Sequence, residues 1–199
     1  MKSVAIIGGG LGGIASAIRF KSRGYEVSLY ERLDDLGGRA QKFSKDGYIH
    51  DAGPTVITAP YLFKELFSLL NENIDNYVIF QPLDPWYRFY FNDGTGFDYG
   101  PDRKKMLEQI DQISPRDVDG YLKMLKQAEE IFEIGYEKLA SEPFNKIFKM
   151  LRYGPDIIRL GGYKSVYSFV SKYLEHPNLR QAFSIQPLLV GGNPFTTSS

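Results

Sequence analysis

The first 31 positions of the chain combine two hydrophobic periods. The run Val4-Ala5-Ile6-Ile7 is short, apolar and rich in β-branched residues, which is typical of a buried strand. Small and apolar residues then recur at helical spacing through Ile14-Ala15-Ser16-Ala17-Ile18, and Gly24 is placed to end that helix. A second apolar stretch, Glu26-Val27-Ser28-Leu29-Tyr30, ends on Glu31. The pattern therefore predicts a β-α-β unit.

The remaining positions predict hairpins first and helices afterwards. The expected hairpins join Gln41–Phe43 to Tyr48–His50 and Trp86–Phe91 to Thr95–Tyr99, around Lys45-Asp46-Gly47 and Asn92-Asp93-Gly94. The apolar run Tyr77–Phe80 predicts a further strand. The expected helices cover Tyr61–Leu70, Pro101–Ile113, a long segment capped by Ser114 with Pro115 in its first turn and running towards Ala140, Ser165–Leu174, and Asn178–Phe183.

This order of elements predicts an α/β fold with three regions. Residues 1–80 carry the β-α-β unit, residues 81–100 form a hairpin, and residues 101–199 are mainly helical. A doubly wound sheet needs more parallel strands than this chain predicts. We therefore expect the missing strands to come from beyond Ser199.

Composition narrows the possible chemistry. The 199 residues include no cysteine, which excludes disulfides, thiolate metal sites and cysteine nucleophiles in this sequence. The 24 basic residues balance the 24 acidic ones, so nothing favours a nucleic-acid partner. Aromatic residues reach 15%, which suits large apolar contacts. No apolar run of about 18 residues predicts a membrane-spanning helix.

The glycines between the first strand and its helix carry the clearest chemical signal. Gly8, Gly10 and Gly13 follow the dinucleotide-binding pattern. In that pattern the first glycine permits a tight turn, the second lets the backbone approach a pyrophosphate, and the third allows close packing of the helix on the strand. The positive end of the helix would face the phosphates. Glu31 is spaced to accept a hydrogen bond from a ribose 2′-hydroxyl, and it would repel a 2′-phosphate.

A second glycine pair, Gly37-Gly38, precedes Arg39 and Ala40. It suits a loop that returns to the cofactor, with the arginine facing a phosphate or the protein's own carboxylates. The alternative is an ordinary turn beside a solvated charge.

Several motifs together resemble a known family. They are Gly8–Gly13, Gly37–Ala40, Asp51–Thr58, Ser114–Tyr121, Ser165–Ser168, Leu179–Ser184 and Leu188–Phe195. The first of these are similar to many flavin amine oxidases, and the later ones are similar to the bacterial phytoene desaturases of carotenoid synthesis. The resemblance covers the whole chain.

The resemblance implies non-covalently bound FAD in a Rossmann-like, amine-oxidase/GDI-like fold, of which this chain is the N-terminal portion, inactive alone. It implies desaturation of phytoene or a related polyene, with a quinone or oxygen reoxidising the flavin. The candidate cofactor-binding residues are Gly8, Gly10, Leu11, Gly12, Gly13, Glu31, Arg32, Gly37, Gly38, Arg39, Ala40, Gly53, Pro54, Thr55 and Val56.

A catalytic group is harder to assign. Arg152 matches a Met-Leu-Arg segment of bacterial relatives and is our candidate for a polar group near the reacting carbon, although it also fits a solvated or lipid-facing cation. Some relatives have an acid where this chain has Lys149. The alternatives for the whole protein are a carotenoid isomerase or ketolase, an amine oxidase, or a non-catalytic prenyl-binding protein of the same fold.

Residues 143–172 suggest a membrane surface. This segment holds six basic residues against one acid, together with six aromatic residues. Basic residues attract anionic headgroups, and aromatic residues favour the headgroup boundary. We expect a cytoplasmic protein attached peripherally to the membrane through this segment, or else packing of its apolar face into the protein's own core.

Overall fold

The computed structural model describes residues 2–53, 56–138, 153–155 and 158–198. The chain forms two compact units, Met1–Pro82 and Leu83–Ser199, and each is described separately below. Unit one contains β1 (Ser3–Ile7), α1 (Leu11–Ser22), β2 (Glu26–Tyr30), the 3₁₀ turn η1 (Gly38–Ala40), β3 (Lys42–Lys45), β4 (Tyr48–Asp51), α2 (Pro60–Ser68) and η2 (Ile74–Asn76).

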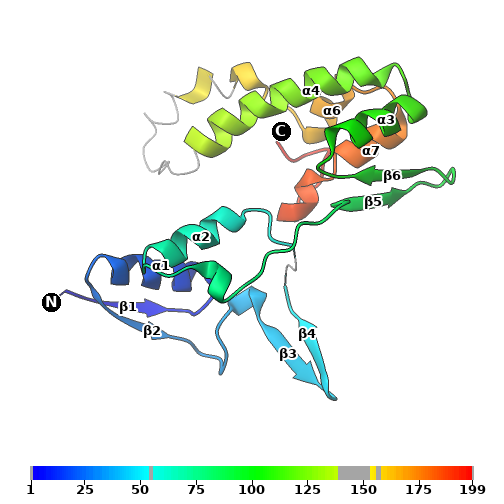
Figure 1. Cartoon of the computed structure of the whole chain (residues 1–199). Coiled ribbons are helices and arrows are strands. Elements are labelled where there is room, and N and C mark those ends of the chain that lie inside the picture. The colour runs from blue at the N-terminus through cyan, green and yellow to red at the C-terminus, as the bar shows by residue number, and fades with distance from the viewer. Residues whose placement is uncertain (1, 54–55, 139–152, 156–157, 199) are drawn as a thin grey trace. The chain divides into compact units, whose positions relative to one another are not determined.

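The predicted β-α-β unit is present. Strands β1 and β2 pair in parallel with Ile6 opposite Leu29, and α1 covers one face of the pair (Figure 1). Alternation along each strand directs half-buried side chains such as Ile6 and Leu29 to one face. The other face carries Ile7 and Tyr30, whose exposed fractions are 91% and 61%. This two-stranded sheet therefore leaves apolar surface uncovered within the described residues.

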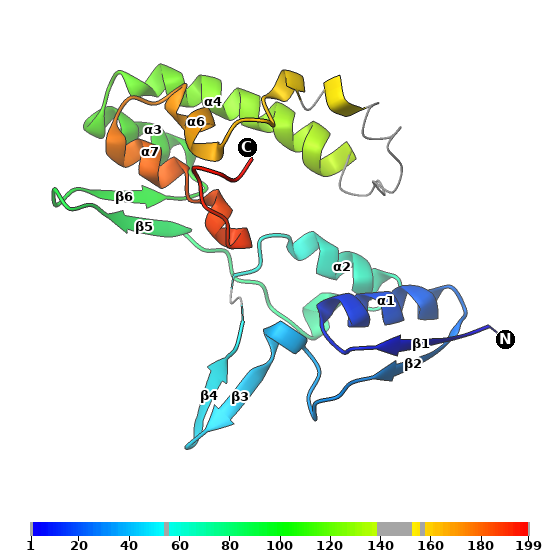
Figure 2. The same cartoon turned by 180° about the vertical axis from the view of Figure 1, so that it is seen from behind.

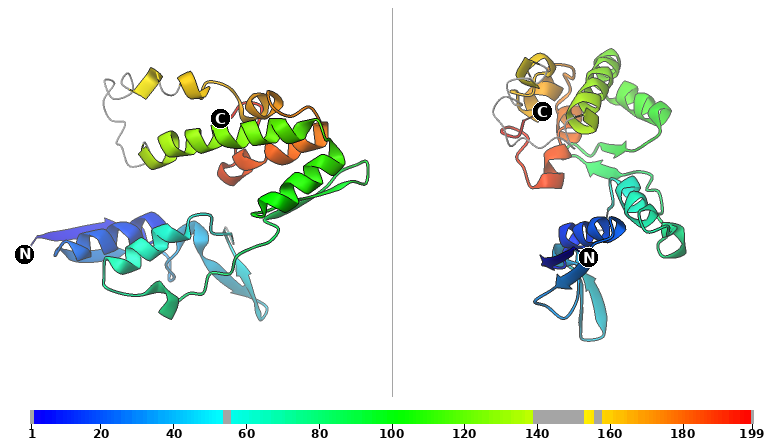
Figure 3. Two further views of the ribbon diagram at one scale, coloured as in Figure 1. Left: turned by 45° about the horizontal axis from the view of Figure 1, so that its top comes forward. Right: turned by 90° about the vertical axis from the view of Figure 1, so that its left-hand side faces the viewer.

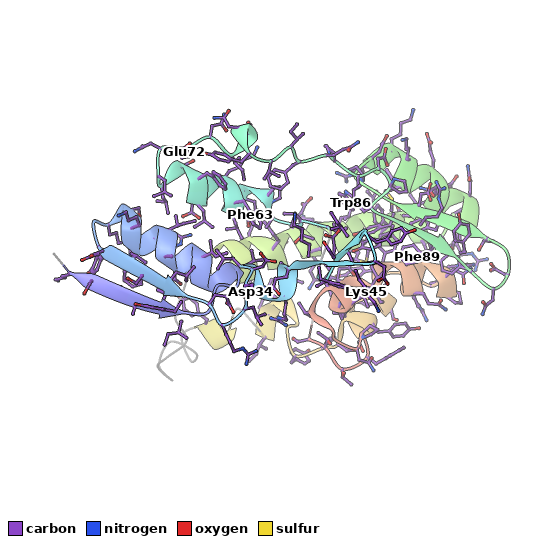
Figure 4. The ribbon with its side chains drawn as sticks, turned by 90° about the horizontal axis from the view of Figure 1, so that it is seen from below. Asp34, Lys45, Phe63, Glu72, Trp86 and Phe89 are labelled. Atoms are coloured by element: carbon purple, nitrogen blue, oxygen red, sulfur yellow. The ribbon has the colours of Figure 1, made fainter. Side chains whose placement is uncertain are left out.

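Helix α2 lies beside α1, as the front and rear views agree (Figures 1 and 2). The Arg19 guanidinium on α1 donates two hydrogen bonds to the Glu65 carboxylate on α2, at 2.9 and 3.0 Å. Both side chains are more than 40% exposed, so solvent screens this ion pair and it contributes little to stability. The first predicted hairpin forms as β3 and β4, with Lys45 at the end of β3 (Figure 4).

The predicted strand over Tyr77–Phe80 is wrong. The Tyr77 and Val78 amides both donate to the Ile74 carbonyl, so the backbone turns instead of extending along a neighbouring strand. The aromatic rings of this segment pack on α2: Tyr77 lies 5.2 Å from Phe67, and Phe80 lies 6.3 Å from Phe63, between ring centroids. An apolar run of this length fits either arrangement, and ring packing on α2 determines the observed one.

Unit two contains the second predicted hairpin and most of the helices. Its elements are β5 (Tyr87–Tyr90), β6 (Gly96–Tyr99), α3 (Arg103–Ile113), α4 (Asp117–Ile131), the π-helical turn η3 (Phe132–Lys138), α6 (Val166–Ser171), α7 (Pro177–Phe183) and the 3₁₀ turn η4 (Gln186–Val190). Within this unit α4 runs alongside α6 and α7, as two further views show (Figure 3). The helices predicted over Ser165–Leu174 and Asn178–Phe183 are confirmed, the first in shorter form.

The core of unit two joins the hairpin to α3, α4, α6 and α7. Its buried side chains are Phe97, Met106, Ile110, Tyr121, Met124, Val170, Leu174, Leu179, Ala182 and Phe183. Phe183 contacts the rings of Phe97, Tyr99 and Tyr121, with centroids 5.2 to 5.6 Å apart. Phe89 of β5 packs on Phe97, whereas Trp86 lies just before that strand, against Tyr99 (Figure 4). Burial of these aromatic side chains stabilises the unit.

The predicted cap at Ser114 is also wrong. Ser114 closes α3, because its amide donates to the Ile110 carbonyl, and α4 begins three residues later at Asp117. The Asp117 carboxylate is fully buried and accepts hydrogen bonds from the Glu175 and His176 amides, at 2.7 and 2.9 Å. One buried acid therefore fixes the two residues that precede α7, which lie 58 and 59 positions later in the chain.

Candidate dinucleotide-binding site

The first glycine loop makes a sharp turn at the end of β1. Gly8 has φ of +104°, a left-handed conformation that glycine adopts without strain, and its amide donates to the Tyr30 carbonyl at 2.7 Å. Gly10 caps α1, and the Ile14 amide donates to its carbonyl at 2.9 Å. The turn therefore directs the start of α1 towards the edge where β1 and β2 both end.

Gly13 is required by close packing between the helix and the loop. A Cβ atom added there would lie 1.9 Å from the Gly8 carbonyl oxygen. Gly10 and Gly12 differ: a Cβ on Gly10 would be 3.9 Å from its nearest neighbour, the Gly38 Cα, and a Cβ on Gly12 would meet nothing within 4 Å. The loop thus keeps open space beside Gly10 and Gly12, as the approach of a pyrophosphate requires.

The start of α1 also has the charge that a phosphate needs. The first intrahelical bond begins at Ile14, so the amides of Leu11, Gly12 and Gly13 precede the hydrogen-bond ladder of the helix. The first turn contains no acidic residue. Free amides and the positive end of the helix dipole together fit a dinucleotide pyrophosphate.

The second glycine pair lies directly against the first. Gly37 and Gly38 have φ of +118° and +58°, and the Gly37 amide donates to the Gly9 carbonyl at 2.8 Å. A Cβ on Gly38 would lie 3.0 Å from the Gly10 Cα, so glycine at position 38 permits close approach of the two loops. Figure 4 shows Asp34 in the segment that leads from β2 to this turn.

Glu31 joins β2 to the glycine loop. One carboxylate oxygen accepts from the Gly9 amide at 2.6 Å, and the other accepts from the Arg32 and Leu33 amides at 2.8 and 3.0 Å. Hydrogen bonds from backbone amides hold the pKa of the Glu31 carboxyl below its usual range. The bond from Leu33 has the largest effect, and the bond from Gly9 has the next largest. Glu31 is therefore a stable anion at the edge where the ribose of a dinucleotide is expected.

A third segment reaches the same loops. A Cβ on Gly53 would lie 2.0 Å from the Arg39 carbonyl oxygen, and the Ala52 amide donates to Gln41 at 2.8 Å. Arg39 and Ala40 have exposed side chains beside this contact, and Val56 is 46% exposed. The structure thus brings Gly53 to the Gly37–Ala40 turn.

The other candidate residues fall into two groups. Leu11 and Arg32 lie beside the glycine loops with exposed side chains. Pro54, Thr55, Lys149 and Arg152 lie outside the described residues, so the catalytic candidate stays a sequence prediction.

One contributor to the site, Gly9, was missed by the sequence analysis. Gly9 occupies a variable position of the glycine pattern, yet it is buried, and a Cβ there would lie 2.4 Å from Leu36 Cδ2 and 3.2 Å from a Glu31 carboxylate oxygen. The one available signal was a third glycine, between Gly8 and Gly10, to which the pattern assigned no role.

Unit two contains a polar hollow of about 440 Å³ between the β5–β6 hairpin and α3. Arg88 pairs with Asp98 there at 2.6 Å, and Lys105 pairs with Asp84 at 3.2 Å. The charged lining does not suit a hydrocarbon. Among the described residues, no cluster of metal-ligating side chains is found, and no helix has both the length and the apolar character needed to cross a bilayer.

The glycine loop, the acid after β2 and a helix start without acidic residues define a dinucleotide-binding unit. Comparison with known families identifies the class. Residues 11–199 match the family described as flavin containing amine oxidoreductase, and the chain belongs to that family. This confirms the expected fold class, and the cofactor is FAD. The glycine loops fit that cofactor, because they leave its phosphates both space and free amides.

The most informative relatives are carotenoid enzymes. The chain is 45% identical over all its 199 residues to the lycopene-forming phytoene desaturases of Pseudescherichia vulneris and of Pantoea ananas. It is 32% identical, over 98% of its length, to a 4,4′-diaponeurosporene oxygenase of Staphylococcus aureus. It spans about 40% of the length of these relatives. The resemblance to phytoene desaturases is thus confirmed across the whole chain.

The solved structures establish the fold alone. A putrescine oxidase double mutant superimposes with a TM-score of 0.52 and 17% identity, over 99% of this chain and 38% of that one.

Proposed function

We propose that the full-length protein is an FAD-dependent desaturase that introduces carbon–carbon double bonds into phytoene or a related polyene. The observation that carries this proposal is 45% identity to lycopene-forming phytoene desaturases over all 199 residues, an alignment that includes the helical unit two. The 17% identity to a putrescine oxidase supports a shared fold and no shared substrate.

In this proposal the described residues bind and orient the cofactor. The amides at the start of α1 receive the pyrophosphate, and the Glu31 carboxylate receives the adenosine ribose. When bound, the flavin supplies a hydride acceptor, and a quinone or oxygen reoxidises it. Arg152 is our candidate for the polar group that acts near the reacting carbon.

The polyene has no polar group, so its site must be apolar along its length. The polar hollow of unit two does not meet this requirement. The turn η4 does, because Leu188, Leu189 and Val190 are each more than half exposed. We therefore place the substrate against η4.

The test is to express the full-length gene in a bacterial host engineered to accumulate phytoene. Coloured, more unsaturated products should replace phytoene, and a Gly13→Ala variant should leave phytoene unchanged. Purified enzyme with phytoene in liposomes, supplied with a quinone under nitrogen or with oxygen alone, identifies the acceptor. Flavin-loaded enzyme that leaves phytoene intact under both conditions would contradict the proposal.

The same products separate the alternatives. Oxygen inserted into a polyene would indicate an oxygenase, as the Staphylococcus aureus relative is named. Hydrogen peroxide formed with an amine would indicate an amine oxidase. A protein without flavin that retains prenyl lipid would indicate the non-catalytic alternative.

We further propose attachment to the cytoplasmic face of the membrane through residues 143–172. Of this segment, residues 153–155 and 158–172 are described. Tyr163 is 69% exposed there, with the Lys164 ammonium 5.7 Å from its ring. Exposed aromatic and basic side chains together favour a headgroup boundary.

Liposome co-sedimentation tests this attachment. Full-length protein with Tyr163→Ser and Lys164→Glu should bind anionic vesicles more weakly at low salt. A Lys123→Glu control changes the charge equally at an exposed site on α4. Equal loss in both proteins would show a general charge effect and remove the segment from the contact.

A further inference from the structure

Glu31 has more hydrogen bonds to the protein than a simple ribose ligand needs. Three backbone amides, those of Gly9, Arg32 and Leu33, donate to its two oxygens at 2.6 to 3.0 Å. A carboxylate offers about four acceptor positions. Glu31 therefore keeps about one position for a hydroxyl and uses the others within the protein.

The bond to Gly9 reaches the centre of the loop assembly. Gly9 is buried, and its carbonyl accepts from the Gly37 amide at 2.8 Å on the opposite side. Leu36 covers Gly9, as the short distance from a Cβ added to Gly9 shows. The two backbone groups of one residue, Gly9, thus join the end of β2, the first glycine loop and the second glycine loop.

We propose that Glu31 is a positioning residue that sets the glycine loops in their binding conformation before FAD arrives. An acid at this site removes the cost of ordering a glycine-rich segment at the moment of binding, because glycine has more conformational freedom to lose than any other residue. This role is additional to contact with the ribose. It rests on the flavin cofactor and not on the proposed desaturation.

A ligand comparison separates the two roles. Full-length apoprotein is titrated with FAD and with an FAD analogue whose adenosine lacks both ribose hydroxyls. If Glu31 positions the loops, Glu31→Ala weakens binding of both ligands, by roughly tenfold or more for a lost hydrogen bond to a charged group. A residue that served only the ribose would leave affinity for the dideoxy analogue unchanged.

Hydrogen exchange in the apoprotein gives a second measurement that needs no ligand. The peptide containing Gly8–Gly13 should exchange faster in Glu31→Ala than in the wild type. Glu26→Ala is the matched control, because Glu26 is an exposed glutamate at the opposite end of β2 from Glu31. Exchange of the loop should be unchanged in that control.

Glu31→Gln covers the case in which the alanine variant does not fold. Glutamine has nearly the same shape and can still bond a ribose hydroxyl, but its amide group would face a backbone N–H donor. We expect faster loop exchange and equal weakening of both ligands. Wild-type exchange together with wild-type affinity for the dideoxy analogue in this variant would overturn the proposal, whether or not the protein desaturates phytoene.

Discussion

The contact between Gly13 and the Gly8 carbonyl leads to a prediction with a built-in control. Gly13→Ala places a Cβ 1.9 Å from that oxygen, and Gly12→Ala places one where nothing lies within 4 Å. The two changes add the same methyl group at neighbouring positions of α1. They differ in whether the helix must move away from the loop.

The two substitutions should change the unfolding free energy in opposite directions. Forcing a methyl group into a filled space costs typically 1–3 kcal/mol, and here the opposing atom is backbone, which cannot rotate away. At Gly12 the same change removes only the flexibility of glycine within a helix, a gain of about 0.5–1 kcal/mol. We therefore expect Gly13→Ala to lower the unfolding free energy of the full-length apoprotein and Gly12→Ala to maintain or raise it.

Urea unfolding of both apoproteins, followed by FAD titration, is the measurement. Gly13→Ala should also bind FAD weakly, because the displaced helix start no longer presents its amides to the phosphates. Wild-type unfolding free energy in Gly13→Ala would refute the close-packing argument. Destabilisation of equal size in both variants would show that glycine is needed there for another reason.

Three further predictions use other parts of the structure. Gly10→Val should abolish FAD binding while the apoprotein keeps its wild-type circular dichroism, since the protein leaves room at Gly10 and the pyrophosphate needs that room; a full flavin complement would contradict this. Asp117→Ala should lower the unfolding free energy by roughly 3 kcal/mol, Asp117→Asn by less, and the exposed Asp119→Ala hardly at all, because the Glu175 and His176 amides lose their buried acceptor; equal stability of all three variants would refute it. The Arg88 guanidinium lowers the pKa of the Asp98 carboxyl below the ordinary aspartate pKa of 3.8. The stability that Asp98 contributes is therefore fully present at pH values above 3.8, and it is lost as the pH falls through the lowered pKa of the folded state. An advantage of wild type over Asp98→Asn at about pH 6 should therefore shrink by about pH 3 in urea unfolding, and a constant difference would contradict the assignment.

The sequence by itself determined the elements whose signals are local. The β-branched run of β1, the helical spacing of α1 and the glycine at position 24 are each readable within a few residues, because strand and helix periods are set by the backbone. The hairpin around Asn92-Asp93-Gly94 follows from the turn preference of those residues. The positions of Gly8, Gly10 and Gly13 carried the nucleotide-binding prediction for the same reason.

Tertiary structure decided which partner each group found. Tyr77–Phe80 has the composition of a strand, but its rings pack on α2. Asp117 was expected just inside a helix capped by Ser114, and its side chain instead holds two amides near position 175. The sequence pattern assigned no role to Gly9. In the folded chain its amide donates to Glu31, and Leu36 lies against it. A local pattern fixes what a segment can form, whereas the choice among competing partners depends on the burial and hydrogen bonding that distant residues supply, and these exist only once the chain has folded.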